Sequence, residues 1–193
     1  MNELPFKIRR LEAKDIPTVT SIDRLVFHDP WPESAYVQEL YFNPNAHYFV
    51  LQLTPAMPTH SWAERRAALA SQIVGFVGVR VEMERGHIST LAVRPEWRGW
   101  GLGEFLLYTV LEQAIRDGAH TVALEVRISN AVAQNLYAKY DFVVVSQLRG
   151  YYADGEDAYY MRTNVEERRY YDYLQQRRAL LESRFHPQPA SIA

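Results

Sequence analysis

The chain has 193 residues, 48% of them hydrophobic, which is typical of a single domain with a substantial core, and its net charge of −2 argues against general attraction to nucleic acid or membranes. Cysteine is absent, which excludes disulfides, thiolate metal sites and a cysteine nucleophile. The N-terminus lacks the layout of a signal peptide and no apolar run is long enough to span a bilayer, so we expect a cytoplasmic protein.

Hydrophobic spacing predicts an alternation of strands and helices along the chain. In chain order the predicted elements are a strand at 6–10, helices at 13–27 and 33–41, strands at 48–53, 73–82 and 86–93, a helix at 102–116, a strand at 121–127, a helix at 130–139, strands at 142–148 and 158–162, and a helix at 164–184. Prolines on both sides of Trp31 separate the first two helices. A tight turn near Glu84, Arg85 and Gly86 would make two of the strands a hairpin.

Two segments interrupt or extend this alternation. Residues 54–72 begin with prolines and continue with a capped, alanine-rich stretch, which predicts an inserted loop and short helix. The helix at 164–184 is mixed in charge and is expected to pack on the rest of the protein. Its predicted inward-facing residues are Tyr170, Tyr173, Leu174, Leu180 and Leu181. We therefore divide the chain into a domain at 1–163, containing the insertion, and a helical extension with a loose tail at 164–193.

The run from Arg98 to Gly103 is the most informative stretch of the sequence. It follows an apolar strand, places glycines at 99, 101 and 103, and leads directly into an amphipathic helix. Such a loop can turn its backbone N–H groups outward at the positive end of the helix dipole and bind a pyrophosphate. This run contains no lysine, which excludes a P-loop, and its position in the middle of the chain does not fit a dinucleotide-binding fingerprint. The loop alone remains weak evidence, because many glycine-rich turns are only structural.

Three further residues are ambiguous when each is considered alone. For Glu125, on the strand after the helix, the ordinary alternative is a surface carboxylate paired with an arginine. For Asn130 the alternative is a cap of the following helix, and for Tyr137 it is a core aromatic residue.

Together, the order and spacing of these motifs resemble the GCN5-related N-acetyltransferase (GNAT) family, which binds acetyl-CoA. The family's loop pattern, [Gln/Arg]-x-x-Gly-x-[Gly/Ala], is met by Arg98, Gly101 and Gly103. Within the family the sequence is most similar to the RimI-type ribosomal-protein-alanine N-acetyltransferases. The supporting motifs are Pro30-Trp31, Leu91-Ala92-Val93, Leu124-Glu125-Val126-Arg127 with Ser129-Asn130, Leu136-Tyr137, Arg149-Gly150-Tyr151-Tyr152, and Glu156-Asp157-Ala158 through Met161. The resemblance covers residues 6–162, with Asp141-Phe142 where the family usually has Gly-Phe; aspartate tolerates the left-handed conformation of such a turn.

This resemblance implies an α/β fold whose mixed, mostly antiparallel central sheet has six to seven strands flanked by helices. The sheet is expected to splay apart between the strands at 87–93 and 121–127, and the pantetheine arm of acetyl-CoA would lie in the gap. The resemblance assigns cofactor binding to Leu91, Ala92 and Val93 near the thioester, to Arg98, Gly99, Trp100, Gly101, Leu102 and Gly103 at the pyrophosphate, and to Asn130 along the pantetheine.

The resemblance also implies direct attack of an amine on acetyl-CoA, with Glu125 as general base, Tyr137 protonating the leaving thiolate, and no metal. The expected acceptor is the N-terminal alanine of a small-subunit ribosomal protein, entering a groove walled by Trp31, Tyr151 and Tyr152. Direct nucleic-acid or membrane binding is not expected, and the protein would be a monomer or homodimer. Two alternatives stay open: an acetyltransferase of small amines or lysine side chains, and a non-catalytic acyl-CoA-binding module.

Overall fold

A computed structural model describes residues 4–54 and 72–185. Within these ranges the strands form one seven-stranded sheet in the order β1-β2-β3-β4-β5-β7-β6. The strands are β1 (Phe6–Arg10), β2 (Ala46–Leu53), β3 (Ile73–Glu82), β4 (Arg85–Val93), β5 (Thr121–Arg127), β6 (Val143–Leu148) and β7 (Ala158–Asn164). The helices are α1 (Ile16–Val26), α2 (Glu33–Phe42), α4 (Leu102–Arg116), α5 (Ala131–Ala138) and α6 (Arg168–Ser183), with short 3₁₀ helices at Ala13–Asp15 and Pro95–Trp97. The mixed α/β fold predicted from the sequence is confirmed.

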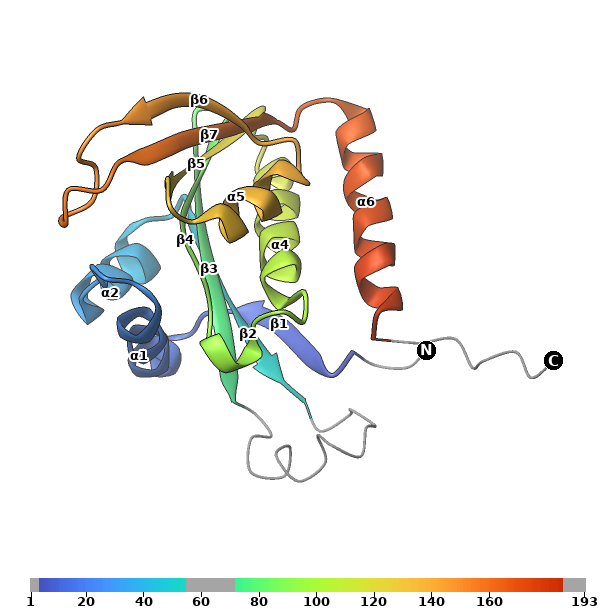
Figure 1. Ribbon diagram of the computed structural model, residues 1–193. Helices are drawn as coiled ribbons and strands as arrows, with labels where there is room; N and C mark the ends of the chain where they lie inside the picture. Colours follow the sequence, from blue (N-terminus) through green and yellow to red (C-terminus); the bar gives the residue numbers. More distant parts are fainter. Residues whose placement is uncertain (1–3, 55–71, 186–193) are drawn as a thin grey trace.

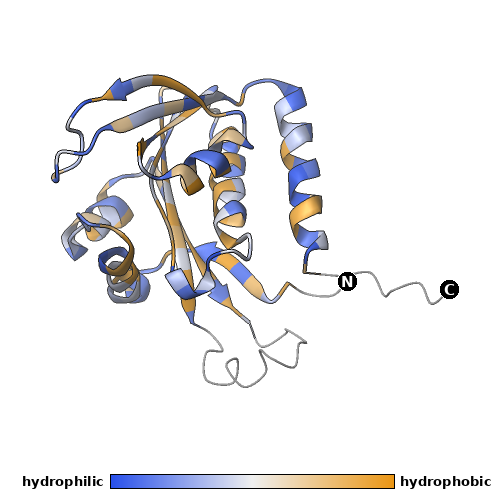
Figure 2. Cartoon of the chain, viewed as in Figure 1, coloured by the Kyte–Doolittle hydropathy of each residue, from blue (hydrophilic) through white to orange (hydrophobic). Residues whose placement is uncertain are grey.

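Helices cover both faces of the sheet, with α1 and α2 on one face and α4 and α6 on the other (Figure 1). The buried residues accordingly form two apolar clusters. One joins α1 and α2 to β2 and β3, and the larger one joins α4 and α6 to the sheet. Hydrophobic residues are concentrated on the strands and on α4, whereas α6 alternates between hydrophilic and hydrophobic positions (Figure 2).

The sheet opens between β4 and β5, its only parallel pair among the described strands. These strands pair at only three positions, Arg85 with Thr121, Gly86 with Val122, and His87 with Ala123. Opposite Gly78 and Val79 of β3, β4 contains one extra residue, Ser89, and a bulge of this kind bends a strand away from its neighbour. The remainder of β4 and β5 therefore diverges, which confirms the predicted splay.

Helix α6 is an integral part of the larger core. Tyr170, Leu174 and Leu181 are buried, and the Tyr170 hydroxyl donates a hydrogen bond to the Tyr140 carbonyl at 3.0 Å. The expected inward position of Leu180 is wrong, because its side chain is 57% exposed. The helix also begins at Arg168 instead of residue 164, since β7 continues to Asn164 and Glu167 serves as the N-cap.

The far side of α4 is covered by α6. The sequence predicted one apolar stripe on α4, facing the sheet. The structure also buries Leu107, Tyr108 and Leu111. Tyr108 contacts α6 directly, accepting a hydrogen bond from Gln175 at 3.0 Å. Helix α4, which carries the glycine-rich loop at its N-terminus, is thus held between the sheet and α6 (Figure 1).

The β3–β4 hairpin turns at Met83 and Glu84, which both adopt positive φ angles of 45° and 65°. The sequence predicted the turn near Glu84, Arg85 and Gly86; Glu84 does lie in it, whereas Arg85 and Gly86 already belong to β4. Asp141 adopts a φ of 57°, as expected for an aspartate replacing glycine at a turn. The insertion predicted at 54–72 and the tail after residue 185 lie outside the described residues, apart from Thr54 and Gln72. Across 4–54 and 72–185 no helix is both long and apolar enough to cross a bilayer.

Candidate active site

The glycine-rich loop presents an uncapped helix N-terminus beside the open end of the sheet. Gly99 and Gly101 have φ angles of 83° and 80°, values that side chains disfavour, and Gly101 is the N-cap of α4. No side chain in the described chain caps this helix. The Arg98 side chain folds back and donates from Nε to the Val93 carbonyl at 3.2 Å, which fixes the loop to the end of β4. The first backbone amides of α4 are therefore left to bind an anion.

The other predicted cofactor residues surround this loop. Leu91, Ala92 and Val93 form the end of β4, beyond its last pair with β5, so the edge of β4 that faces β5 carries no strand there. Leu102 is buried, Gly103 is half-buried, and Trp100 is 42% exposed. The arrangement suits a ligand lying along β4 with its phosphates at the loop.

Glu125 lies at the divergence of the two strands and is held by two donors. Its Oε2 is 2.8 Å from His87 Nε2, and its side chain is 17% exposed. A hydrogen bond to Glu125 and the charge of this carboxylate add to burial in raising the pKa of Tyr151. The carboxylate is thus oriented by a histidine and a tyrosine. Among the arginines in 4–54 and 72–185 none pairs with it, in contrast to the ordinary alternative.

His87 is the site residue that the sequence reasoning missed. It lies on β4 at the last residue pair with β5, and its side chain is 32% exposed. Because a carboxylate only accepts hydrogen bonds, Nε2 carries the proton toward Glu125. The other ring nitrogen, Nδ1, is buried and makes no hydrogen bond within the described residues. The alternation of side chains along each strand is a sequence signal that could have drawn attention to this histidine. Its contact with Glu125 was not predictable in this way, because it depends on the parallel register of β4 and β5.

Two tyrosines, Tyr151 and Tyr152, connect Glu125 to Tyr137, the second predicted catalytic residue. The rings of Tyr151 and Tyr152 meet edge to face with centroids 5.1 Å apart. Tyr137, on α5, is 7% exposed, and its pKa is raised first by burial and further by Tyr152. The Tyr137 hydroxyl therefore stays protonated near neutral pH, and the structure brings Glu125, Tyr137, Tyr151 and Tyr152 into one cluster.

Arg127 fixes the loop that carries the tyrosine pair. Its Nη1 lies 2.8 Å from Asp154 and 2.7 Å from Glu156, and its guanidinium stacks 3.9 Å from the centroid of the Tyr152 ring. Burial raises the pKa of Tyr152 to about 12, against the opposing effect of Arg127. Glu156 also accepts a hydrogen bond from the Ser129 amide at 3.0 Å. These contacts join the β6–β7 loop to the end of β5, next to Glu125.

The remaining two predicted residues have clear structural partners. Asn130 is exposed and accepts a hydrogen bond from the Ala133 amide at 3.1 Å, so it caps α5. Trp31 lies in the α1–α2 loop, with its ring centroid 5.6 Å from that of Tyr36. Its backbone amide donates to the buried Asp23 at 2.5 Å. Their roles toward cofactor and acceptor stay predictions.

The α1–α2 loop approaches the β6–β7 loop. The pKa of Asp154 is lowered chiefly by its hydrogen bond with Arg127, and the charge of His28 in the α1–α2 loop adds to this effect. Among the described side chains, no group of three or more is placed to hold a metal ion.

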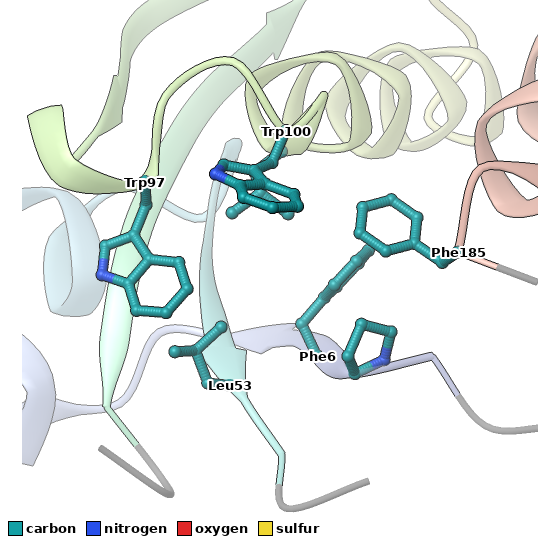
Figure 3. Close-up of a pocket in the computed structure, with 7 residues that line it drawn as sticks. Phe6, Leu53, Trp97, Trp100 and Phe185 are labelled. Atoms are coloured by element: carbon teal, nitrogen blue, oxygen red, sulfur yellow. The ribbon is translucent and has the colours of Figure 1, made fainter. Parts of the chain in front are cut away.

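A small apolar pocket lies under the glycine-rich loop (Figure 3). It has a volume of about 20 Å³ and is lined by Pro5, Phe6, Leu53, Trp97, Trp100, Leu102 and Phe185. None of these residues belongs to the Glu125 cluster. The pocket therefore lies where the residues before β1 and the end of α6 pack beneath the loop, and it is not the candidate active site.

The sheet that splays between β4 and β5, with an uncapped helix N-terminus at its open end, agrees with an acetyltransferase fold. The model of the Acetyltransferase (GNAT) family matches residues 16–142, and the chain belongs to this family. It is similar to the putative [ribosomal protein bS18]-alanine N-acetyltransferase of Bacillus subtilis, with 32% identity over 83% of this chain and 96% of the relative. An N-alpha-acetyltransferase of Sulfurisphaera tokodaii is 32% identical over 81% of this chain and 91% of its own length.

Among solved structures, the ribosomal-protein-S18-alanine N-acetyltransferase of Escherichia coli superposes with a TM-score of 0.68 at 26% identity. The match covers 84% of this chain and 95% of that one. The resemblance to RimI-type enzymes and the GNAT fold expected from the sequence are both confirmed, and the protein is an acyltransferase.

Proposed function

We propose that this protein transfers the acetyl group of acetyl-CoA to the α-amine of a protein N-terminus. The observation that carries the proposal is Glu125, held by His87 and Tyr151 where β4 and β5 diverge. These two side chains hold the carboxylate at the open end of the sheet, where the amine would enter. The names of the Bacillus subtilis and Sulfurisphaera tokodaii relatives support an N-terminal amine as acceptor.

In the proposed reaction both substrates bind before chemistry, and no covalent enzyme intermediate forms. A protein α-amine has a pKa of about 7.7–8.0, so part of it is neutral near neutral pH and binds in that form. Its nitrogen attacks the thioester carbon, Glu125 accepts the proton that the nitrogen loses as the carbon–nitrogen bond forms, and the carbon–sulfur bond then breaks. Backbone N–H groups near Leu91 to Val93 stabilise the charge that develops on the carbonyl oxygen. Tyr137 supplies the proton to the departing thiolate of coenzyme A.

The acceptor that we propose is the N-terminal alanine of a small-subunit ribosomal protein, as the relatives' names indicate, which would place the enzyme in the cytoplasm. The peptide would enter between the loop carrying Trp31 and the loop carrying Tyr151 and Tyr152. The approach of His28 to Asp154 supports this groove, because it brings the two loops to the same edge of the site. Asn130, exposed at the start of α5, would contact the pantetheine with the part of its amide that does not cap the helix.

A peptide panel tests the acceptor assignment. Peptides that differ only in their first residue are incubated with acetyl-CoA, alongside spermidine and a peptide with an internal lysine and a blocked N-terminus, and products are detected by mass. Acetylation of the alanine peptide at its α-amine is expected. If only the polyamine or the lysine peptide is acetylated, the acceptor is a small amine or a side chain and the proposal is wrong.

Two variants test the assigned chemistry. Glu125→Gln and Tyr137→Phe should each lower kcat by about 10²–10⁴-fold while the affinity for acetyl-CoA stays near that of the wild type. The control is Glu84→Gln, which removes a 67% exposed carboxylate at the β3–β4 turn and should leave turnover unchanged. Wild-type turnover in both site variants would favour a different base and acid, and acetyl-CoA binding without any turnover in the wild type would favour a non-catalytic binding module.

A further inference from the structure

The end of α6 places an unpaired arginine against the glycine-rich loop. The Arg184 Nη1 atom lies 3.4 Å from the position that a Cβ on Gly101 would occupy, and Leu181 Cδ2 lies 3.8 Å from it. Gly101 is the left-handed N-cap of α4, so the guanidinium adjoins the uncapped amides that are available to an anion. A positive charge here reinforces the partial positive charge of the helix N-terminus.

The position of Arg184 is set by its neighbours. Leu181 is 1% exposed and belongs to the main core. Phe185 packs against Phe6 and Phe105, with ring centroids 5.3 Å and 5.8 Å apart. Figure 3 shows the rings of Phe6 and Phe185 close together, on the side of the pocket next to Trp100. The backbone at Arg184 is therefore anchored by the packed side chains of the residues on both sides of it.

Arg184 also differs from the other arginines of α6. Arg168, Arg169, Arg177 and Arg178 each pair with a carboxylate, whereas no ion pair or side-chain hydrogen bond joins Arg184 to any residue in 4–54 or 72–185. Its side chain is exposed. A guanidinium next to an anion-binding loop with no carboxylate neutralising it is suited to bind a phosphate, in the bidentate or forked geometry that guanidinium favours.

The same helix removes an obstacle to anion binding. Glu104 lies in the first turn of α4 and is buried at 3% exposure, so its negative charge would repel a phosphate at the loop. Burial alone would raise the pKa of Glu104, but hydrogen bonds from Arg177 and Lys139 outweigh burial and lower it. The carboxylate is thus ionised and neutralised by Arg177 of α6 and by Lys139 at the end of α5.

We infer that Arg184 is a cofactor-binding residue that contacts the pyrophosphate of acetyl-CoA, so that α6 completes the phosphate site. This inference rests on the proposed function, in which acetyl-CoA is the donor. It assigns a binding role to the C-terminal extension. The sequence motif of the loop ends at Gly103 and gives no indication of this role.

Binding of acetyl-CoA by calorimetry tests the inference with Arg184→Gln, Arg184→Lys and the control Arg168→Gln. The control removes the same charge at the other end of α6, where Arg168 is 88% exposed. Arg184→Gln should weaken binding by about tenfold, the effect of losing one charge-assisted contact of about 1.4 kcal/mol. Arg184→Lys should keep part of the affinity, and Arg168→Gln should match the wild type. The loss should shrink at high salt, and the KM for acetyl-CoA should rise without a change in kcat.

The outcomes separate this inference from the proposed function. If the wild type does not bind acetyl-CoA, the proposed function fails. If the wild type binds and Arg184→Gln binds equally well, the inference alone is overturned. A loss that disappears with 3′-dephospho-acetyl-CoA overturns the pyrophosphate contact, because the arginine would then act on the 3′-phosphate. Unchanged thermal unfolding of the unliganded Arg184→Gln variant confirms that the loss reflects binding and not folding.

Discussion

Removing Arg177 should destabilise the protein strongly, because it leaves Glu104 buried with only a half-exposed lysine and a tyrosine hydroxyl as described partners. Glu104 is 3% exposed and contacts Arg177, Lys139 and the Tyr140 hydroxyl. Breaking a buried ion pair from one side costs about 3–5 kcal/mol. Arg177 is 21% exposed and Lys139, at 47% exposure, remains, so we expect Arg177→Met to lower the free energy of unfolding by about 2–4 kcal/mol.

A double-mutant cycle isolates this interaction. Glu104→Gln alone should cost less, about 1–2 kcal/mol, because the remaining Arg177 can reach solvent. The double variant should be more stable than the sum of the single losses predicts, with a coupling of about 1.5–3 kcal/mol. Urea unfolding measures all four proteins, and the midpoint of thermal unfolding should fall by about 2–4 °C for each kcal/mol.

The coupling should also depend on pH, and the sign follows from the lowered pKa of Glu104 in the folded state. A carboxyl group whose pKa is lower folded than unfolded stabilises the fold above its unfolded pKa of about 4.3, and loses that contribution as the pH falls through its folded value. The difference between wild type and Arg177→Met should therefore be full at pH 7 and shrink in acid. A variant within about 0.5 kcal/mol of wild type at pH 7, or a coupling near zero, would refute the reasoning.

Two further predictions concern the loop and α6. Gly101→Ala forces a side chain into a φ of 80°, so it should lower the free energy of unfolding by about 1–2 kcal/mol and weaken acetyl-CoA binding. The Cβ of Gly103→Ala would have no neighbour closer than 3.7 Å, so this control should leave the unfolding midpoint nearly unchanged. Equal midpoints in the two variants would contradict this prediction. Leu174→Ala should lower the free energy of unfolding by about 2–5 kcal/mol, because this side chain is fully buried. Leu180→Ala, at a 57% exposed position, should change it by no more than about 0.5 kcal/mol in urea unfolding. Similar losses in the two variants would show that α6 is oriented differently.

The sequence predicted best where local signals and tertiary environment agree. The bounds of α4 and β5 match the prediction because a periodic apolar stripe and a clear alternation are both local patterns. Motif order also predicted Glu125, Tyr137, Tyr151 and Tyr152 as site residues; the structure shows interactions that link them, and their roles stay predictions.

The failures share a different cause, which is packing between segments distant in sequence. Leu180 was expected inside because leucines at 180 and 181 fit a helical stripe equally well, and only the position of α4 decides between them. His87 was overlooked because its partner lies 38 residues away across a parallel strand pair. The β3–β4 turn was predicted near Glu84, Arg85 and Gly86, one to two residues late, because Met83 and Glu84 adopt positive φ angles that non-glycine residues disfavour. Arg184 likewise meets the loop only through the antiparallel packing of α6 on α4.

The short pairing between β4 and β5, which spans three residue pairs, affects how the protein moves and how it folds. Strands β1 to β4 form one antiparallel unit and strands β5 to β7 another, and among the described residues backbone hydrogen bonds join the two sets of strands only around residues 84–87 and 120–123. The two units can tilt about this short seam without breaking any other strand pair, and the packing of α4 limits the tilt. During folding each unit can form from neighbouring hairpins first, whereas the seam must wait for the α4 crossover to close. A ligand wedged in the open end would stiffen this hinge, so backbone amides near the seam should exchange their hydrogens more slowly when acetyl-CoA is bound.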